Sequence, residues 1–180
     1  MTIGDLNADF SPMLINFRVS NFLSFREEVE FSALASLERQ HRDRIFQSKS
    51  MGLNLLPTAA FYGGNGSGKS NLYKALQFAQ KLVLQAGVKP EDGIERECFR
   101  LDSECRNAPS IFGFDLLIGK QCLRYEFAVT DTAVVHESLG FLDGDRVKPI
   151  FTRERIGERD TWSPDSFKGL KVNKDDREFL

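Results

Sequence analysis

Eight consecutive residues carry the clearest chemistry in this sequence. They read Gly63-Gly64-Asn65-Gly66-Ser67-Gly68-Lys69-Ser70 and meet the pattern G-x-x-x-x-G-K-[S/T] in full. Glycines permit positive φ and bring successive backbone N–H groups around an anion, and a helix that starts at the loop's end adds its own unpaired N–H groups. A lysine in this place puts an ammonium group between the β- and γ-phosphates. The segment therefore predicts a site for a nucleoside triphosphate, ATP with Mg²⁺.

Roles can be assigned to the side chains of this phosphate loop, residues 63–70. Lys69 is the predicted catalytic residue, because its charge neutralises the phosphates, and Ser70 is the predicted Mg²⁺ ligand. Asn65 and Ser67 lie at the crest, where they can contact the edge of the triphosphate. The predicted cofactor-binding set is Gly63, Gly64, Asn65, Gly66, Ser67, Gly68, Lys69, Ser70 and Asn71.

Two flanking elements must hold such a loop in place. Residues 58–62 predict a short buried strand that runs into the glycines. After Lys69 the apolar residues follow a helical period, so a helix is expected to about residue 84 and to end at Gly87 and Pro90. Its apolar stripe consists of Leu72, Ala75, Leu76, Ala79, Leu82 and Val83.

The remaining pattern is mostly that of β-strands. The expected strands are 13–19, 28–31, 111–118, 123–129, 133–142 and 147–152, with turns at 21–25, 119–121 and 143–145. Polar residues at 36–52 predict an excursion with room for a short helix, and 87–109 a charged connection. The fold class is therefore α/β: a β-hairpin start, the phosphate loop and its helix, then an antiparallel meander.

Composition bounds the other possibilities. The 180 residues are 41% hydrophobic and 28% charged, which is typical of one soluble domain. The net charge of −2 gives no global attraction to nucleic acid or to an anionic membrane. No apolar run of 18 residues and no secretory signal occur, so a cytoplasmic protein without a membrane span is expected. Cys98, Cys105 and Cys122 form no C-x-x-C pair, which argues against a metal site and suits a reducing compartment.

Two segments resemble a known family. Residues 15–25, Ile-Asn-Phe-Arg-Val-Ser-Asn-Phe-Leu-Ser-Phe, and residues 61–71 around the loop are similar to ABC-type ATPase heads of the SMC and RecF group. The likeness is greatest to the AAA-annotated anti-phage branch, which includes the PtuA subunit of Septu, retron-associated ATPases and OLD-like nucleases. It implies a phosphate-loop NTPase fold in which residues 13–152 form the N-terminal lobe. Residues 1–12 would be a lead-in, and 153–180 a connection toward a second lobe.

The resemblance also implies what the chain would work with. In such heads ATP lies between two protomers. The second lobe contributes a signature loop, an apolar strand that ends in Asp-Glu, and a switch histidine. None of these is found here, so a fragment of a longer chain is expected. The nearest apolar run ends at Asp115, which we interpret as a strand residue facing solvent or a turn. Implied partners are a second ATPase protomer and a nuclease or toxin effector, in anti-phage defence, with DNA only by analogy.

Alternatives remain open. Asn173-Lys174-Asp175-Asp176 matches the guanine-reading N-K-x-D pattern of a GTPase. A non-hydrolysing, nucleotide-gated interaction module is the other rival, because no catalytic carboxylate is visible. Smaller features have ordinary interpretations: a solvated loop for His41, Arg42 and Arg44, a strand-edge carboxylate for Glu137, and a solvated surface for the mixed charges around Arg153, Arg155 and Arg159.

Overall fold

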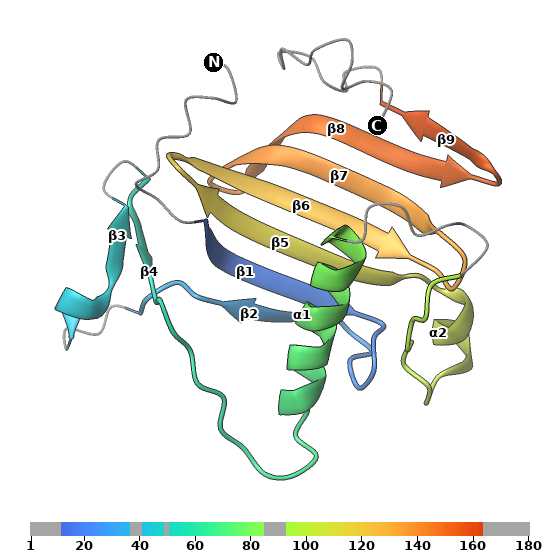
Figure 1. The fold of residues 1–180 in the computed structure, drawn as a ribbon, viewed down its shortest axis with the longest axis horizontal. Helices are drawn as coiled ribbons and strands as arrows, with labels where there is room; N and C mark the ends of the chain where they lie inside the picture. The colour runs from blue at the N-terminus through green and yellow to red at the C-terminus, as the bar shows by residue number, and fades with distance from the viewer. Residues whose placement is uncertain (1–11, 37–40, 49–50, 85–92, 164–180) are drawn as a thin grey trace.

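The computed structural model describes residues 12–36, 41–48, 51–84 and 93–163. Its main element is a seven-stranded sheet in the order β2-β1-β5-β6-β7-β8-β9, in which every neighbouring pair is antiparallel (Figure 1). The strands are β1 Met13–Ser20, β2 Val29–Ser32, β5 Ser110–Ile118, β6 Gln121–Val129, β7 Val134–Asp143, β8 Arg146–Ile156 and β9 Arg159–Trp162. The expected hairpin start and antiparallel meander are thus confirmed.

Helix α1, Lys69–Leu84, crosses one face of this sheet (Figure 1). Ala75 and Ala79 of this helix are fully buried, and their small side chains let the helix lie close to the strands. The core beneath it is largely aromatic, with the stacked rings of Phe112 and Phe127 at 5.2 Å. The buried members of this cluster are Phe17, Val19, Phe22, Ala75, Ala79, Phe112, Phe127 and Val129. This packing fixes the direction of the helix that follows the phosphate loop.

A small hairpin has its own apolar cluster. Strands β3, Phe46–Ser48, and β4, Leu53–Leu55, pair with each other after a short 3-10 turn at Arg42–Arg44. The fully buried Leu55 packs in a cluster with the buried residues Ile15, Leu117 and Cys122. Sequence reasoning expected a solvated excursion here and missed the hairpin, because three-residue strands are too short to show a period.

Other differences from the sequence prediction are local. The expected strand at 58–62 is wrong: residues 57–62 belong to no helix or strand and are exposed. Helix α2, Ser103–Asn107, lies in the expected charged connection, with Asp102 as its N-cap. Strand β8 continues beyond 152, and β9 pairs with it, although this stretch is polar. The expected helix end at Gly87 and Pro90 lies outside the described residues.

Candidate phosphate-binding site

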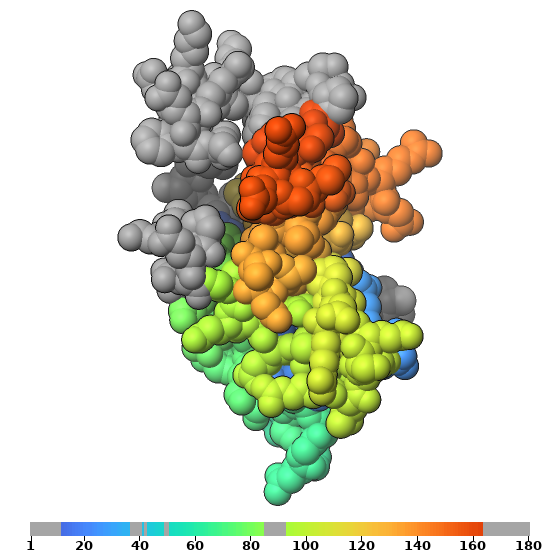
Figure 2. Space-filling view, turned by 90° about the vertical axis from the view of Figure 1, so that its right-hand side faces the viewer, coloured from blue at the N-terminus to red at the C-terminus, as the bar shows by residue number. Residues whose placement is uncertain are grey.

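The phosphate loop forms the turn that leads into α1. Gly66 and Gly68 have φ of 81° and 89°, which a side chain would strain, so the glycines at these two positions are required by the backbone. The first helical hydrogen bond runs from the Leu72 amide to the Gly68 carbonyl at 3.0 Å. By the geometry of a helix start, the amides just before Leu72 have no carbonyl within the helix to bind. The loop projects at the lower end of the molecule in Figure 2.

The ammonium group of Lys69 lies within the loop. Its Nζ donates to the carbonyls of Gly63 and Gly64, both at 2.7 Å, and to Ser67 Oγ at 3.1 Å. A Cβ added at Gly63 would come within 2.9 Å of Ser67 Oγ, so a side chain there would require Ser67 to move. The positive charge of Lys69 therefore lies between the carbonyls of Gly63 and Gly64 and the Ser67 hydroxyl. This donor set of ammonium, backbone amides and a helix start is the chemistry that a polyphosphate requires.

Access to the loop is open. Residues 61–67 and Ser70 are exposed, whereas Gly68 and Lys69 are half-buried. Ser70 lies on the first turn of α1, one residue after Lys69, where its hydroxyl could bind a metal ion beside the phosphates. Asn65, at the tip, is exposed as expected. The residues present thus fit Mg-ATP: Lys69 would hold the phosphates, Ser70 would hold the metal, and the metal would reduce the charge of the phosphates.

Asn71 has a hydrogen-bond partner outside the loop. Its amide Nδ2 donates to Ser24 Oγ at 2.8 Å, across 47 residues of sequence. Ser24 belongs to the turn after β1, which also contacts the last glycine of the loop: a Cβ on Gly68 would lie 3.6 Å from Phe25 Cε1. Sequence reasoning did not include this turn in the site, and no spacing rule reveals a contact over that separation.

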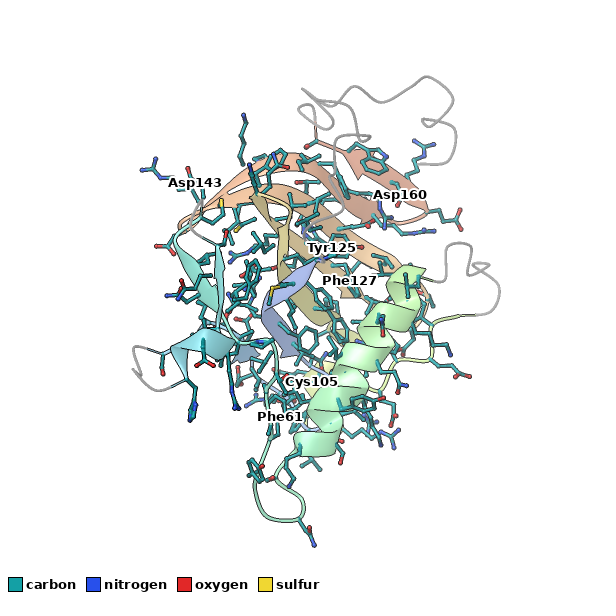
Figure 3. All side chains as sticks on the ribbon, turned by 60° about the vertical axis from the view of Figure 1, so that its left-hand side comes forward. Phe61, Cys105, Tyr125, Phe127, Asp143 and Asp160 are labelled. Carbon is teal, nitrogen blue, oxygen red and sulfur yellow. The ribbon has the colours of Figure 1, made fainter. Side chains whose placement is uncertain are left out.

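The segment that leads into the loop has no regular secondary structure and is exposed. Phe61 is 53% exposed and Tyr62 is 91% exposed. The Phe61 ring packs on Phe31 of β2, with centroids 5.4 Å apart, and Figure 3 shows Phe61 near the start of α1. No described strand pairs with residues 58–62, so their apolar pattern alone does not make a strand.

Asp115 is the main correction among the predicted residues. It is fully buried in β5 and does not face solvent. Arg18 and Arg124 each donate two hydrogen bonds to its carboxylate, at 2.7 to 3.0 Å, and Asn16 donates a fifth. Burial alone would raise the pKa of Asp115, but these hydrogen bonds and the charge of Arg18 hold it well below its usual range. Asp115 is therefore a structural anion.

Glu137 and Arg153 also have structural partners. Glu137 is not on a sheet edge, because β7 lies between β6 and β8. It accepts hydrogen bonds from the Tyr125 hydroxyl at 2.8 Å and from Arg153 at 2.9 Å. Arg153 also pairs with Asp160, and its side chain is only 14% exposed. Figure 3 shows Tyr125 and Asp160 on the sheet, well away from Phe61.

His41 and Arg44 are exposed, in agreement with a solvated loop. Within the described ranges, no group of three or more His, Cys, Asp or Glu could hold a metal ion, and the three cysteines are free. Burial raises the pKa of the Cys122 thiol. The N-K-x-D stretch at 173–176 lies outside the described residues.

A hollow elsewhere on the molecule does not coincide with the loop. It has a volume of about 650 Å³ and lies along α1, lined among others by Phe22, Lys81 and Glu97. None of its lining residues belongs to the loop. Because it carries acidic and basic side chains together and no glycine-rich backbone, the loop is the better phosphate site. Among the described helices, none is long and apolar enough to cross a membrane.

Comparison with known proteins identifies the family. Residues 59–178 match the family model described as "AAA domain, putative AbiEii toxin, Type IV TA system". No curated protein and no solved structure matches the chain. The matched region begins four residues before Gly63 and covers two thirds of the sequence. The chain therefore belongs to this AAA-domain family and, with it, to the P-loop ATPases.

Proposed function

We propose that the chain binds Mg-ATP through residues 63–70 and acts as the N-terminal lobe of an ABC-type ATPase head in the cytoplasm. One observation carries the proposal: the Lys69 ammonium group lies inside an exposed glycine turn at the start of a 16-residue helix. Lys69 would neutralise the phosphates, and Ser70 would bind the metal. Electrostatic stabilisation of a transferring phosphoryl group is the main contribution that such a site makes.

Hydrolysis would need groups beyond the phosphate loop itself. A carboxylate must orient the attacking water or bind the metal from outside the loop. Asp115 is fully engaged by two arginines inside the sheet and cannot do so. We therefore propose that a second lobe and a second protomer complete the site. The exposed backbone at 57–62, which pairs with no described strand, would be available to a strand of that lobe.

The output of such a head would be control of an effector. The family description names a toxin and a toxin–antitoxin system. Together with the resemblance to anti-phage ATPases, this supports a role in defence. ATP would hold a head-to-head dimer, hydrolysis or loss of the nucleotide would release that dimer, and the head would control a nuclease or toxin partner. DNA contact rests on the analogy alone.

A non-hydrolysing module is the second candidate. It is favoured because the two carboxylates considered above, Asp115 and Glu137, are both bound to arginines. The two candidates differ in one measurement, the release of inorganic phosphate by the chain when it is saturated with Mg-ATP. Turnover abolished by Lys69→Ala supports the ATPase. Tight binding without turnover, also in the presence of a second lobe, supports the gated module.

The binding proposal is tested by calorimetric titration of the chain with Mg-ATP. Lys69→Ala is expected to weaken binding by about tenfold to a hundredfold, since a charged hydrogen bond is worth roughly 1.5–3 kcal/mol. Lys74→Ala is the matched control: it removes an exposed lysine from the same helix and should leave affinity unchanged. Equal affinities of Lys69→Ala and the unaltered chain would refute the site, and preferential competition by GTP would favour a GTPase.

A further inference from the structure

The turn at 21–25 touches the phosphate loop at two points. Ser24 Oγ accepts the hydrogen bond from Asn71 in the first turn of α1. A Cβ on Gly68 would lie 3.6 Å from Ser24 Oγ and 3.6 Å from Phe25 Cε1, so both side chains lie against the end of the loop. The turn therefore meets the phosphate loop where the loop becomes helix α1. The first amides of α1, which have no partner within the helix, lie at the same place.

The backbone of this turn is strained. Asn21 and Leu23 have φ of 49° and 51°, in the left-handed region, which is rare for leucine. Phe22 and Phe25 close the turn with two backbone hydrogen bonds of 2.9 Å. Such a conformation persists only where the surroundings over-determine it, and it is found preferentially at functional sites.

Those surroundings are present on the side away from the loop. The Asn21 amide Nδ2 donates to three carbonyls, those of Cys105, Ala108 and Pro109, and its Oδ1 accepts from the Phe99 amide. The Leu23 amide donates to the Glu97 carbonyl at 2.7 Å. The buried ring of Phe22 packs on Phe78 and Phe112, with centroids 5.0 and 5.2 Å apart. The turn is thus fixed to the connection at 97–109, to α1 and to the sheet, and Ser24 and Phe25 extend from it.

We propose that this turn positions the phosphate loop, and that Ser24 and Asn71 are positioning residues for nucleotide binding. The inference rests on the proposed function. In it Asn71 is not a phosphate ligand: its amide is engaged by Ser24, and the pair sets the direction in which the first amides of α1 point. The loop itself is exposed and packs little, so this contact restrains it where α1 begins. Preorganised donors bind an anion better than mobile ones do.

A double-mutant cycle tests the proposal by titration with Mg-ATP. Ser24→Ala and Asn71→Ala are each expected to weaken binding by about threefold to tenfold, the range of one neutral hydrogen bond. The double variant should be no weaker than either single variant, because both remove the same contact. Ser24→Thr keeps the hydroxyl and should restore affinity. Melting temperatures should stay within about 2 °C of the parent, since the bond is exposed.

Thr130→Ala is the matched control. It removes a hydroxyl whose hydrogen bonds among the described residues stay within its own turn, just after β6, and it should not affect affinity. If the unaltered chain binds Mg-ATP and the two single variants bind equally well, the positioning role is wrong. If both single variants lose affinity and their losses add in the double variant, Asn71 acts on the phosphates directly, which also overturns the proposal. Failure of the unaltered chain to bind would instead overturn the proposed function.

Discussion

Replacement of Asp115 by asparagine is expected to destabilise the protein strongly at neutral pH without touching the phosphate loop. The carboxylate has no exposed surface and accepts five hydrogen bonds. The variant keeps the shape of the side chain but replaces one acceptor oxygen by an NH₂ group. That group would face the donors of Arg18 or Arg124, so two guanidinium groups would lose their counter-ion.

The magnitude follows from the burial of the partners. Removal of one member of a buried ion pair costs roughly 3–5 kcal/mol, because the other charge stays buried and unpaired. Arg18 has a side chain only 10% exposed, but Glu30 remains 3.5 Å from it, and Arg124 is 32% exposed. Both features reduce the loss. We therefore expect a decrease in the free energy of unfolding of about 3 kcal/mol, at the lower end of that range.

The pH dependence has a definite sign. The folded state holds the pKa of Asp115 below its unfolded value of about 3.9, so the carboxylate stabilises the fold above that pH and loses its contribution as pH falls below it. The difference between the parent and Asp115→Asn should therefore be constant from pH 5 to pH 7. At pH 3 it should be about 1 kcal/mol smaller, because the unfolded carboxyl is then mostly protonated.

Urea denaturation of both proteins at pH 7, 5 and 3 measures this difference. Glu30→Gln is the control: its carboxylate is 49% exposed and 3.5 Å from Arg18, and such pairs contribute about 0–1 kcal/mol. A loss below about 1 kcal/mol for Asp115→Asn at pH 7 would refute the reasoning about the buried charges. An unchanged difference between pH 7 and pH 3 would refute the assigned direction of the pKa.

Two further substitutions probe the packing that supports the site. Ala79→Leu should destabilise the fold by about 1–3 kcal/mol and weaken Mg-ATP binding, because a larger side chain would push α1 away from the sheet. Gln80→Leu, on the exposed side of the helix, is the control. Urea denaturation midpoints measure the stability of each variant, and titrations measure its affinity for Mg-ATP. Gly140→Ala should cost a similar amount but leave affinity intact, because its Cβ would meet Val147 Cγ1 at 2.6 Å and the Lys148 carbonyl at 2.8 Å; an unchanged urea midpoint would contradict this.

The candidate site contains residues that a local sequence pattern predicts and a contact that it does not predict. The glycines, Lys69 and Ser70 are identified from spacing alone, because the demands of phosphate binding fall on consecutive residues. The contact between Ser24 and Asn71 joins residues 47 positions apart, and nothing in either segment encodes the distance between them. The turn 21–25 is predicted as a turn, but its place beside Gly68 depends on Phe22 packing against Phe78 and Phe112.

By itself the sequence determined the elements with strong periods: helix α1, whose apolar residues recur every three to four positions, and the alternating strands of the meander. It also located the loop. Only the tertiary structure decided whether an apolar segment has a neighbour to pair with, and residues 58–62, which lack one among the described strands, form no strand. The tertiary structure also decided that Asp115 is buried. Its sequence context resembles a solvent-facing strand residue, but two arginines, 97 and 9 positions away, make a buried carboxylate stable there.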